Sequence, residues 1–381
     1  MNILLIGGTG VISTAVSNYC ANLGYNVFII NRGKTKKNIG KNINIIRADI
    51  RKESIDQIKT KINFVKFDVV VDFLTLNVEQ LKKTLSFLDC KQYIFISSAT
   101  IYTENILGHR YREYDDKNNL DWDYCKNKIE CEQYLMSKEN KLLYTIVRPY
   151  VTYDSYRIPN QMLLKNYYSI IDRIIKGLPI VIFGNDIKCT VTSSEDFAVG
   201  LVGLFNNKKA FYQDFHITSD VYTTWDSIIN LLARKLNKTA NIVNIPVEFV
   251  ESIDPNHTAI DVNQIVLDKS RNMIFDNKKI KEAVPEYNSY SKIEDNIDNI
   301  VNLYKDNENK NIDFLWNGCL DRLIYNYSGE KIKINEYKIN NRKNYIKYMI
   351  GRSFMLYNFY RTSRAFLKFL YNKYKRIRGI Q

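Results

Sequence analysis

Residues 1–13 read MNILLIGGTGVIS, an apolar run that passes directly into a glycine-rich turn and then into a helical pattern. The apolar run predicts a buried strand. A glycine turn between a strand and a helix lets backbone N–H groups approach a pyrophosphate at the helix N-terminus. Gly7, Gly10 and Ser13 match the spacing G-x-x-G-x-x-G, and the small Ser13 still permits close packing of the helix on the strand. We therefore predict a dinucleotide-binding turn, with an ordinary strand-to-helix turn as the alternative.

Further β-rich runs alternate with amphipathic stretches, at residues 26–30, 43–47, 69–73, 93–97 and 143–147. This alternation is typical of an α/β protein whose strands form a doubly wound parallel sheet of the Rossmann type. Later in the chain the pattern loosens, with helices expected near residues 163–176 and 224–236 and short strands around 180–183 and 240–245. The expected parts are a dinucleotide-binding domain over residues 1–150, a smaller substrate-binding lobe over 151–304, a linker over 305–343 and a basic amphipathic helical tail over 344–381.

The composition is that of a folded protein, since 381 residues with 45% apolar side chains can fill a sizeable core. The six cysteines contain no C-x-x-C pair, and residues 1–10 have the pattern of a strand and a turn rather than of a signal peptide. A cytoplasmic location is therefore expected. No metal site is expected, because His109, His216 and His257 lack the spacing of metal ligands.

The end of the second expected strand bears on the choice of cofactor. Enzymes specific for NAD usually place a carboxylate there, on the ribose 2′-hydroxyl. This chain has Asn31 and Arg32 instead, followed closely by Lys34, Lys36 and Lys37. Such cations would meet the 2′-phosphate of NADP. We predict NADP as the cofactor, with NAD as the alternative; a solvated basic loop would also explain these cations.

A serine, a tyrosine and a lysine form the candidate catalytic group. Ser98 follows the strand expected at residues 93–97, and Tyr124 and Lys128 begin a helical pattern with a spacing that puts both side chains on one helix face. A phenol with a pKa of about 10 is a poor base at neutral pH. An ammonium about 4 Å away, at an effective dielectric near 20, is worth up to roughly 4 kcal/mol, or about three pKa units. We predict that Ser98 holds the substrate oxygen, that Tyr124 exchanges the proton and that Lys128 also orients the nicotinamide ribose.

The tyrosine–lysine spacing has little specificity by itself in a chain with 28 tyrosines. It recurs at Tyr134/Lys138, Tyr327/Lys331 and Tyr371/Lys375. What distinguishes Tyr124 is the serine at the end of a sheet strand, downstream of the glycine turn. The other three pairs are expected to be surface or tail residues.

These segments resemble the extended short-chain dehydrogenase/reductase family, also called the NAD-dependent epimerase/dehydratase family, over about residues 1–305. Residues 98–102 (SATIY) and 124–132 (YCKNKIECE) are similar to the matching segments of UDP-galactose 4-epimerases. Residues 144–149 (YTIVRP) and 214–220 (DFHITSD) look like an atypical branch of the family. The resemblance implies the serine, tyrosine and lysine roles given above, a nucleotide-sugar substrate, Pro149 beside the nicotinamide carboxamide and, by analogy, a homodimer.

Two sets of binding residues are expected from the motifs and the resemblance together. The cofactor-binding set is Gly7, Gly10, Val11, Ile12, Asn31, Arg32, Asp49, Ile50, Phe73, Lys128 and Pro149. The substrate-binding set is Ser98, Thr100, Tyr124, Tyr150 and Lys188. Asp49, at the end of the third strand, would accept a hydrogen bond from the adenine amine, although a turn aspartate explains it almost equally well.

The chain also departs from the family. Nucleotide-sugar 4,6-dehydratases carry an Asp-Glu pair directly after the catalytic hydroxyl residue, whereas this chain has Ala99 and Thr100, so dehydration is disfavoured. The family's arginine for the sugar-nucleotide diphosphate is replaced by Cys189, with Lys188 adjacent. A lysine can serve a phosphate as a point charge, but without the bidentate fork of an arginine.

We expect an NAD(P)-dependent nucleotide-sugar epimerase that removes a hydride from a ring carbon and returns it to the other face, while Tyr124 takes and returns the hydroxyl proton. An NADPH-dependent 4-ketosugar-nucleotide reductase would use the same residues, and a preference for NADP at Arg32 favours it. The alternative from another class is a non-catalytic RNA-binding protein on a Rossmann scaffold, as in plastid proteins that this branch resembles. The serine–tyrosine–lysine trio argues against it.

The net charge of +14 is concentrated near the C-terminus. Residues 331–381 hold fourteen Lys and Arg and one acid, Glu336, which leaves 41 basic and 40 acidic residues in residues 1–330. Aromatic and basic residues are interspersed from residue 344 to residue 378. A basic helix with one apolar face suits the surface of an anionic membrane. We expect a peripheral contact at the inner face of the membrane, with packing on the enzyme body or a second subunit as the alternative and nucleic acid binding third.

Overall fold

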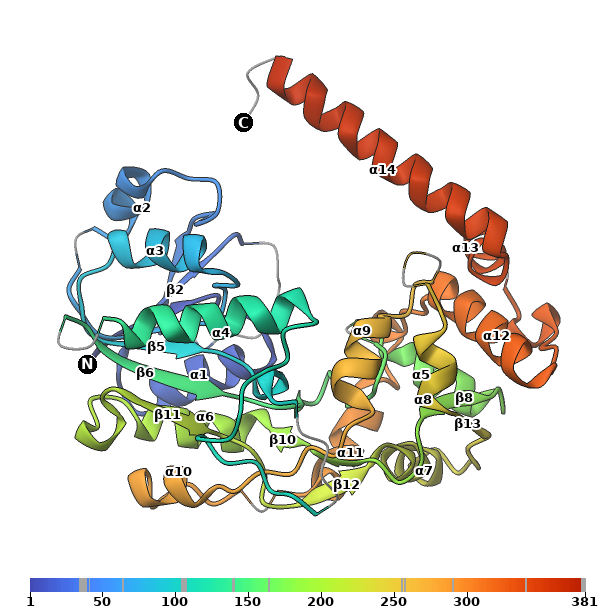
Figure 1. The fold of residues 1–381 in the computed structure, drawn as a ribbon, viewed down its shortest axis with the longest axis horizontal. Helices are drawn as coiled ribbons and strands as arrows, with labels where there is room; N and C mark the ends of the chain where they lie inside the picture. The colour runs from blue at the N-terminus through green and yellow to red at the C-terminus, as the bar shows by residue number, and fades with distance from the viewer. Residues whose placement is uncertain are drawn as a thin grey trace. The chain divides into compact units, whose positions relative to one another are not determined.

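The structure is a computed structural model that describes residues 1–33, 40, 42–63, 65–103, 108–138, 141–163, 165–254, 256, 258–289, 291–339 and 341–377, with the side chains of all of these except residues 307 and 367–377. Contacts divide the chain into two units (Figure 1). Unit 1 comprises residues 1–159, 188–224 and 271–300, and unit 2 comprises residues 160–187, 225–270 and 301–381. The boundaries expected at residues 150, 304 and 343 stay predictions.

Unit 1 contains a seven-stranded parallel sheet in the order β11-β6-β5-β4-β1-β2-β3. The strands are β1 (Asn2–Ile6), β2 (Asn26–Asn31), β3 (Ile43–Arg47), β4 (Phe67–Asp72), β5 (Cys90–Ile96), β6 (Leu143–Arg148) and β11 (Gln213–His216). The prediction of an α/β fold with a Rossmann-type sheet is confirmed. The strand order reverses between β1 and β4. Sheets of this type bind their ligands in the crevice at the carboxyl ends of the strands, at the position of this reversal.

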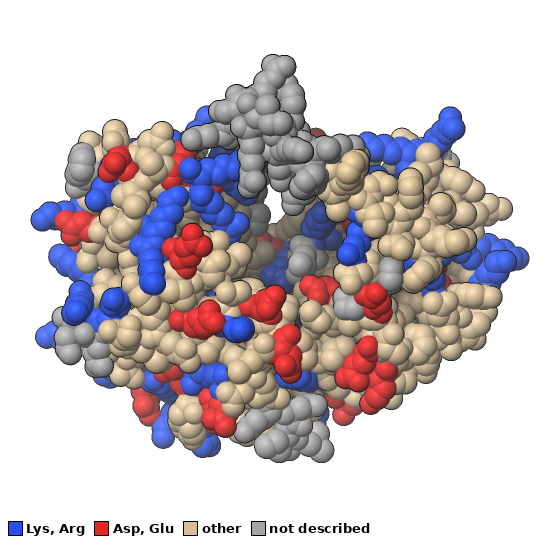
Figure 2. All heavy atoms as spheres, turned by 45° about the horizontal axis from the view of Figure 1, so that its top comes forward, with Lys and Arg blue, Asp and Glu red and all other residues tan. Residues whose placement is uncertain are grey.

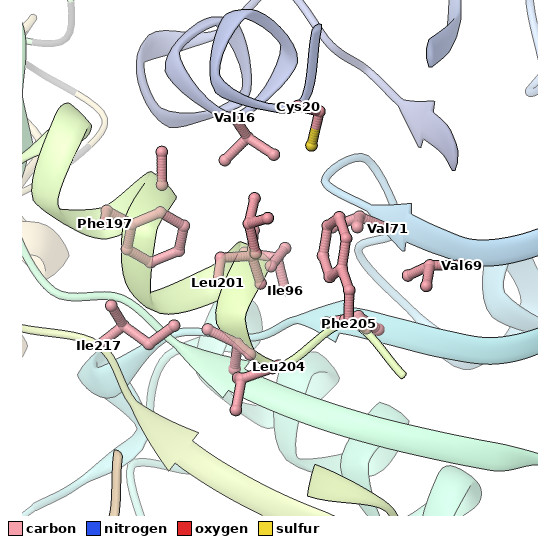
Figure 3. Close-up of a cluster of buried hydrophobic side chains, with 14 of the residues drawn as sticks. Val16, Cys20, Val69, Val71, Ile96, Phe197, Leu201, Leu204, Phe205 and Ile217 are labelled. Carbon is pink, nitrogen blue, oxygen red and sulfur yellow. The ribbon is translucent and has the colours of Figure 1, made fainter. Parts of the chain in front are cut away.

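One face of the sheet is covered by α1 (Val11–Asn22) and α6 (Ser194–Gly203). Figure 3 shows Val16 and Cys20 of α1 above the strands, with Phe197 and Leu201 of α6 in the same buried cluster. The strands reach this cluster with every second side chain, because successive side chains of a strand point to opposite faces. This layer supports the helix that opens after the glycine turn.

The opposite face is covered by α2 (Ile55–Lys61), α3 (Val78–Ser86) and α4 (Asp123–Met136). Leu81 of α3 and Leu135 of α4 are buried here against the remaining strand side chains. Each face of the sheet is therefore closed by helices, as expected for a parallel sheet with apolar central strands. The arrangement brings α4, with its tyrosine and lysine, onto the sheet beside β5.

The rest of unit 1 consists of short elements. Two small strand pairs join β7 (Thr152–Tyr153) to β10 (Thr192–Ser193) and β9 (Lys188–Thr190) to β12 (Tyr222–Thr224). The helix α10 (Lys278–Ala283) belongs to this unit, as does most of α11 (Ile293–Leu303). Among the described residues, none of the helices has the length and apolar composition needed to cross a bilayer.

Unit 2 pairs β8 (Ile180–Phe183) with β13 (Ile242–Ile245) in parallel. Its helices are α5 (Tyr168–Ile175), α7 (Trp225–Lys235), α8 (Val247–Glu251), α9 (Val262–Gln264), α12 (Phe314–Ser328), α13 (Arg342–Arg352) and α14 (Phe354–Ile377). The 15-residue α12 lies inside the stretch predicted as a linker, and Trp316 and Leu320 on it are buried. Residues 314–328 thus contribute to the core of unit 2.

The helix α13 is bound tightly to α12. A Cβ added to Gly318 would lie 2.2 Å from the carbonyl oxygen of Tyr348, and one added to Gly351 would lie 2.2 Å from that of Leu315. The two backbones are therefore in contact at their crossing. Below the crossing, the buried Asp321 accepts hydrogen bonds from Tyr348 (2.7 Å) and Arg173 (2.8 Å). Residues 342–352 are consequently an integral part of unit 2.

Candidate active site

A cavity of about 410 Å³ in unit 1 lies at the carboxyl ends of the central strands. It is lined by Gly7, Thr9, Gly10, Ile12, Ser13, Asn31, Arg32, Ala48, Asp49, Ile50, Arg51, Phe73, Leu74 and Ile96. This set includes most of the residues predicted to bind the cofactor. Of the predicted residues, Val11, Lys128 and Pro149 are outside the lining. Ser13, which also lines the cavity, was predicted as part of the glycine turn. Sequence reasoning missed Thr9, Ala48, Arg51, Leu74 and Ile96, of which all but Ile96 are next to a predicted residue in the chain.

The glycine turn has the geometry that a close backbone approach requires. Gly7 has a φ of +91°, and a Cβ there would lie 2.5 Å from the side chain of Leu74. Ser13 ties the turn together, because its Oγ donates to the Gly7 carbonyl (2.8 Å) and accepts from the Gly10 N–H (2.7 Å). The serine in place of the third glycine is thus a hydrogen-bonding part of the turn.

The basic end of the cavity follows β2. The Asn31 side chain accepts from the Gly33 N–H at 2.7 Å, and Arg32 is exposed at the lining. The side chain of Arg47 lies against Gly33: a Cβ added to Gly33 would be 3.4 Å from the Arg47 Nε. Asp49 is the one carboxylate among the described lining residues, and it accepts from the Arg51 N–H at 3.2 Å. Lys34, Lys36 and Lys37 lie outside the described residues.

Lys128 places an ammonium at the ends of the strands next to this cavity. Its Nζ donates to the carbonyl oxygens of Ile96 and Thr75, each at 2.8 Å, and lies 4.6 Å from the centre of the Phe95 ring. The residue is 3% exposed. Burial lowers the pKa of Lys128 to about 8, although the charge of Asp72 works against this. Since Ile96 lines the cavity, the ammonium is adjacent to the cavity wall.

The depressed pKa predicts how stability depends on pH. Between about pH 8 and 10 the unfolded chain binds more protons at Lys128 than the folded chain, so this lysine destabilises the fold at low pH and ceases to do so as pH rises. We expect the unfolding free energy of the wild type, relative to Lys128→Met, to increase by about 2 kcal/mol from pH 8 to 10. Chemical denaturation of both proteins across this range measures it, and a constant difference contradicts it.

Ser98 and Tyr124 lie on segments that contact each other. Ser98 caps a short helical turn, η1 (Ala99–Ile101), and its Oγ lies 2.9 Å from the Thr100 hydroxyl. That hydroxyl lies 3.3 Å from the Cys125 thiol, which holds the start of α4 against the serine segment. Tyr124 is half-buried, with its ring 5.3 Å from that of Trp122. The catalytic roles of Ser98, Tyr124 and Lys128 stay predictions.

A buried arginine fixes α4 relative to the sheet. Arg148, at the end of β6, is fully buried and donates to both carboxylate oxygens of Glu132 on α4, at 2.9 and 2.6 Å. It also forms an ion pair with Asp214 (2.8 Å) and donates to the hydroxyl of Tyr102 (3.0 Å). Sequence reasoning missed this network. An arginine inside an otherwise apolar strand was the available signal, because such a cation must be paired when it is buried.

The residues predicted to bind the nicotinamide and the sugar lie around the same strand ends. The carbonyl of Pro149 accepts from the Ala99 N–H at 2.9 Å, so the segments that follow β5 and β6 are joined. Tyr150 is buried directly after Pro149. Val11 is half-buried in the first turn of α1. Their contacts with ligands stay predictions.

Lys188 lies in a strand that is hydrogen-bonded to the segment after Arg271, an arginine that sequence reasoning missed. Lys188 lies in β9, with its Nζ 5.7 Å from the centre of the Tyr222 ring, and hydrogen bonds join β9 to the residues that follow Arg271. The half-buried Arg271 donates to the carbonyl of Thr103, just beyond the serine segment (3.3 Å). Cys189 is buried.

Comparison with known proteins identifies the family. Residues 3–210 match the model of the NAD dependent epimerase/dehydratase family. The chain belongs to this family. The resemblance inferred from the serine and tyrosine segments is therefore confirmed.

Among curated proteins, this family member is similar to the chloroplast stem-loop binding protein of 41 kDa b of Arabidopsis thaliana, at 26% identity over 248 residues. The match spans 61% of this chain and 62% of the relative, which is less than two thirds of the relative's length.

Solved structures show the same fold. An epimerase from Methanothermobacter thermautotrophicus matches with a TM-score of 0.66 and 15% identity, over 81% of this chain and 93% of that one. UDP-glucuronic acid 4-epimerase from Bacillus cereus, in complex with UDP-glucuronic acid and NAD, matches with a TM-score of 0.61 and 17% identity, over 80% of this chain and all of that one. At these identities the likeness concerns the fold alone.

Proposed function

We propose that this family member is a nicotinamide-dependent nucleotide-sugar epimerase. The observation that carries the proposal is Lys128, a buried ammonium beside the cavity of the glycine turn and one helical turn after Tyr124. Lowering its pKa from 10.5 to about 8 costs roughly 3 kcal/mol at neutral pH. A protein that only binds a partner gains nothing from burying an ammonium at this cost in free energy. A catalytic tyrosine does gain, because the positive charge stabilises its phenolate.

The cavity fits a dinucleotide. Its volume of about 410 Å³ is within the range of small-molecule sites, and its floor is a glycine turn at a helix N-terminus. Beside it, the Ser97 hydroxyl is buried with no hydrogen-bond partner in the part of the chain that the structure describes, so a polar ligand group could supply one. The fold neighbours whose names include NAD support the same cofactor class.

The chemistry divides among few residues. A bound nicotinamide would accept a hydride from a ring carbon of the sugar and return it. Ser98 would hold the reacting hydroxyl, and Tyr124 would take its proton and return it. Lys128 would stabilise the phenolate of Tyr124, since an ammonium lowers the free energy of a nearby anion. Ala99 and Thr100 follow Ser98 without a carboxylate, which favours epimerisation over loss of water.

We propose NADP as the preferred form because Arg32 and the adjacent Arg47 side chain flank the end of β2. Replacing Arg32 by Ala should weaken NADP binding by about 10- to 100-fold, the loss of charge-assisted hydrogen bonds to a phosphate. NAD, which lacks the 2′-phosphate, is the internal control and should change less than about threefold. Titration calorimetry measures both dissociation constants. Equal losses for the two cofactors would assign Arg32 to the shared part of the dinucleotide.

A 4-ketosugar reductase is the second candidate, favoured by the same Arg32. Turnover of UDP-, GDP-, CDP- and dTDP-sugars, with the absorbance of reduced nicotinamide recorded, tests the proposal. An epimerase yields an isomer with no net change in cofactor, whereas a reductase consumes the reduced cofactor in proportion to product. No turnover of any sugar, with tight binding of a stem-loop RNA, would favour the function named for the chloroplast relative.

A further inference from the structure

The C-terminal basic stretch consists of two parts with different environments. The first part, α13, is built into unit 2 through the crossing of Gly318 and Gly351 and through the buried Tyr348. The second part, α14, is attached near its start by Tyr357, which is buried and has its ring 5.6 Å from the Arg322 guanidinium. Both parts expose side chains, including Tyr345 on α13, but the most exposed apolar side chains of the stretch are on α14.

Several large apolar side chains of α14 are exposed, and the three most exposed lie along one side of the helix. Met355, Phe359 and Phe366 are 79%, 72% and 60% exposed. Their spacing of four and seven residues places them along one face, because residues separated by four or seven lie about one and two turns apart. The buried Tyr357 is two residues from both Met355 and Phe359, so it lies on the opposite side. The apolar face thus points away from the contact that holds α14.

The cations of the chain gather on the same helix. Residues 354–377 contain six Lys and Arg and no acid, whereas residues 1–330 are nearly neutral. On the face of the molecule in Figure 2, basic and acidic side chains are interspersed. Arg361 and Arg364, three residues apart, lie off the line of Met355, Phe359 and Phe366 on the helical wheel. The same helix therefore has an exposed apolar face and, on another side, basic side chains.

We propose that α14 docks on the surface of an anionic lipid bilayer, with its apolar face among the acyl chains and its cations at the headgroups. A second copy of α14 would cover the apolar face but bring two sets of six cations together. A nucleic acid would match the charge but leave Met355 and Phe359 in water. An anionic bilayer accommodates both faces. The docking is independent of the activity proposed above.

The position of truncation matters in testing this proposal. Ending the chain after residue 340 would remove Tyr348 and Gly351 and would expose the buried Asp321. Ending it after Ser353 removes α14 and keeps α13. Flotation with vesicles of phosphatidylcholine and phosphatidylglycerol, compared with phosphatidylcholine alone, should recover the full chain only with the anionic vesicles. The chain that ends at Ser353 should remain with the unbound protein.

Two double variants separate the apolar face from general charge effects. Met355→Glu with Phe359→Glu should reduce partitioning into anionic vesicles at least tenfold. The matched control, Tyr114→Glu with Tyr325→Glu, introduces the same charge at aromatic side chains that are exposed elsewhere, and should float within about twofold of the wild type. Equal flotation of the full and truncated chains overturns the proposal. The proposal is also overturned if the full chain does not float with anionic vesicles but needs α14 to bind a structured RNA or to form a concentration-dependent dimer.

Discussion

Replacing Tyr124 by Phe is expected to lower turnover of the nucleotide sugar by about 100- to 10,000-fold, the usual contribution of a positioned acid–base group. The change removes one hydroxyl from a half-buried side chain in the first turn of α4, so the fold should be retained. The dissociation constant of the cofactor should change little. Steady-state kinetics with the sugar identified by the turnover scan, together with a cofactor titration, measure both effects.

The chain offers a matched control on the same helix. Tyr134 has the same spacing to a lysine, and the Lys138 ammonium lies 4.9 Å from the centre of its ring. Tyr134 packs against the buried cluster between the sheet and the helices α2, α3 and α4, not at the strand ends. Tyr134→Phe should leave turnover within about twofold of the wild type. If both variants lose activity equally, or if Tyr124→Phe remains fully active, Tyr124 is not the proton-transfer group.

Replacing Asp321 by Ala is expected to lower the unfolding free energy by about 3–5 kcal/mol, the cost of leaving a buried charge without its partner. The partner is Arg173, which is fully buried and donates to Asp321 at 2.8 Å. Tyr337 and Tyr348 also donate to this carboxylate, at 2.8 and 2.7 Å. Loss of Asp321 therefore leaves three buried donors without their acceptor and loosens α13 from α12.

Chemical denaturation measures this effect, and an exposed ion pair provides the control. Lys278 and Glu282 are 3.8 Å apart with side chains 79% and 65% exposed. Glu282→Ala should change the unfolding free energy by less than about 1 kcal/mol, because water screens such pairs. A change of similar size in the two variants would mean that Asp321 does not balance a buried charge. The comparison also reports whether α13 is part of the folded unit.

Features that depend on neighbours in the chain could be predicted well. The strands at residues 2–6, 43–47 and 180–183 have the predicted bounds, because each is a short β-rich run between turn signals. The glycine turn and its cavity follow from the same local pattern. The four-residue spacing of Tyr124 and Lys128 on α4 is likewise a consequence of helix geometry.

Features that depend on distant contacts could not be predicted. The run around His216 is strand-like in sequence, but only its pairing with β6 makes it the edge strand β11 of the sheet. The helix α12 lies in the stretch predicted as a linker, although Trp316, Leu320 and Leu323 have helical spacing; only the structure shows that α13 packs on it. Arg148 and Arg271 gained their partners from segments far away in the chain.

By itself the sequence determined the sheet of unit 1, the glycine turn and the family, because local periodicity and short motifs specify strands, helices and backbone turns. Only the tertiary structure decided the environment of the ionisable groups. The pKa of Lys128 is lowered to about 8 because its ammonium is buried where β4 and β5 end. The basic stretch divides at Ser353: α13 is built into unit 2 around Tyr348, whereas α14 is attached near its start by Tyr357 and exposes Met355, Phe359 and Phe366. Burial and charge pairing are properties of the folded chain, and no spacing in the sequence encodes them.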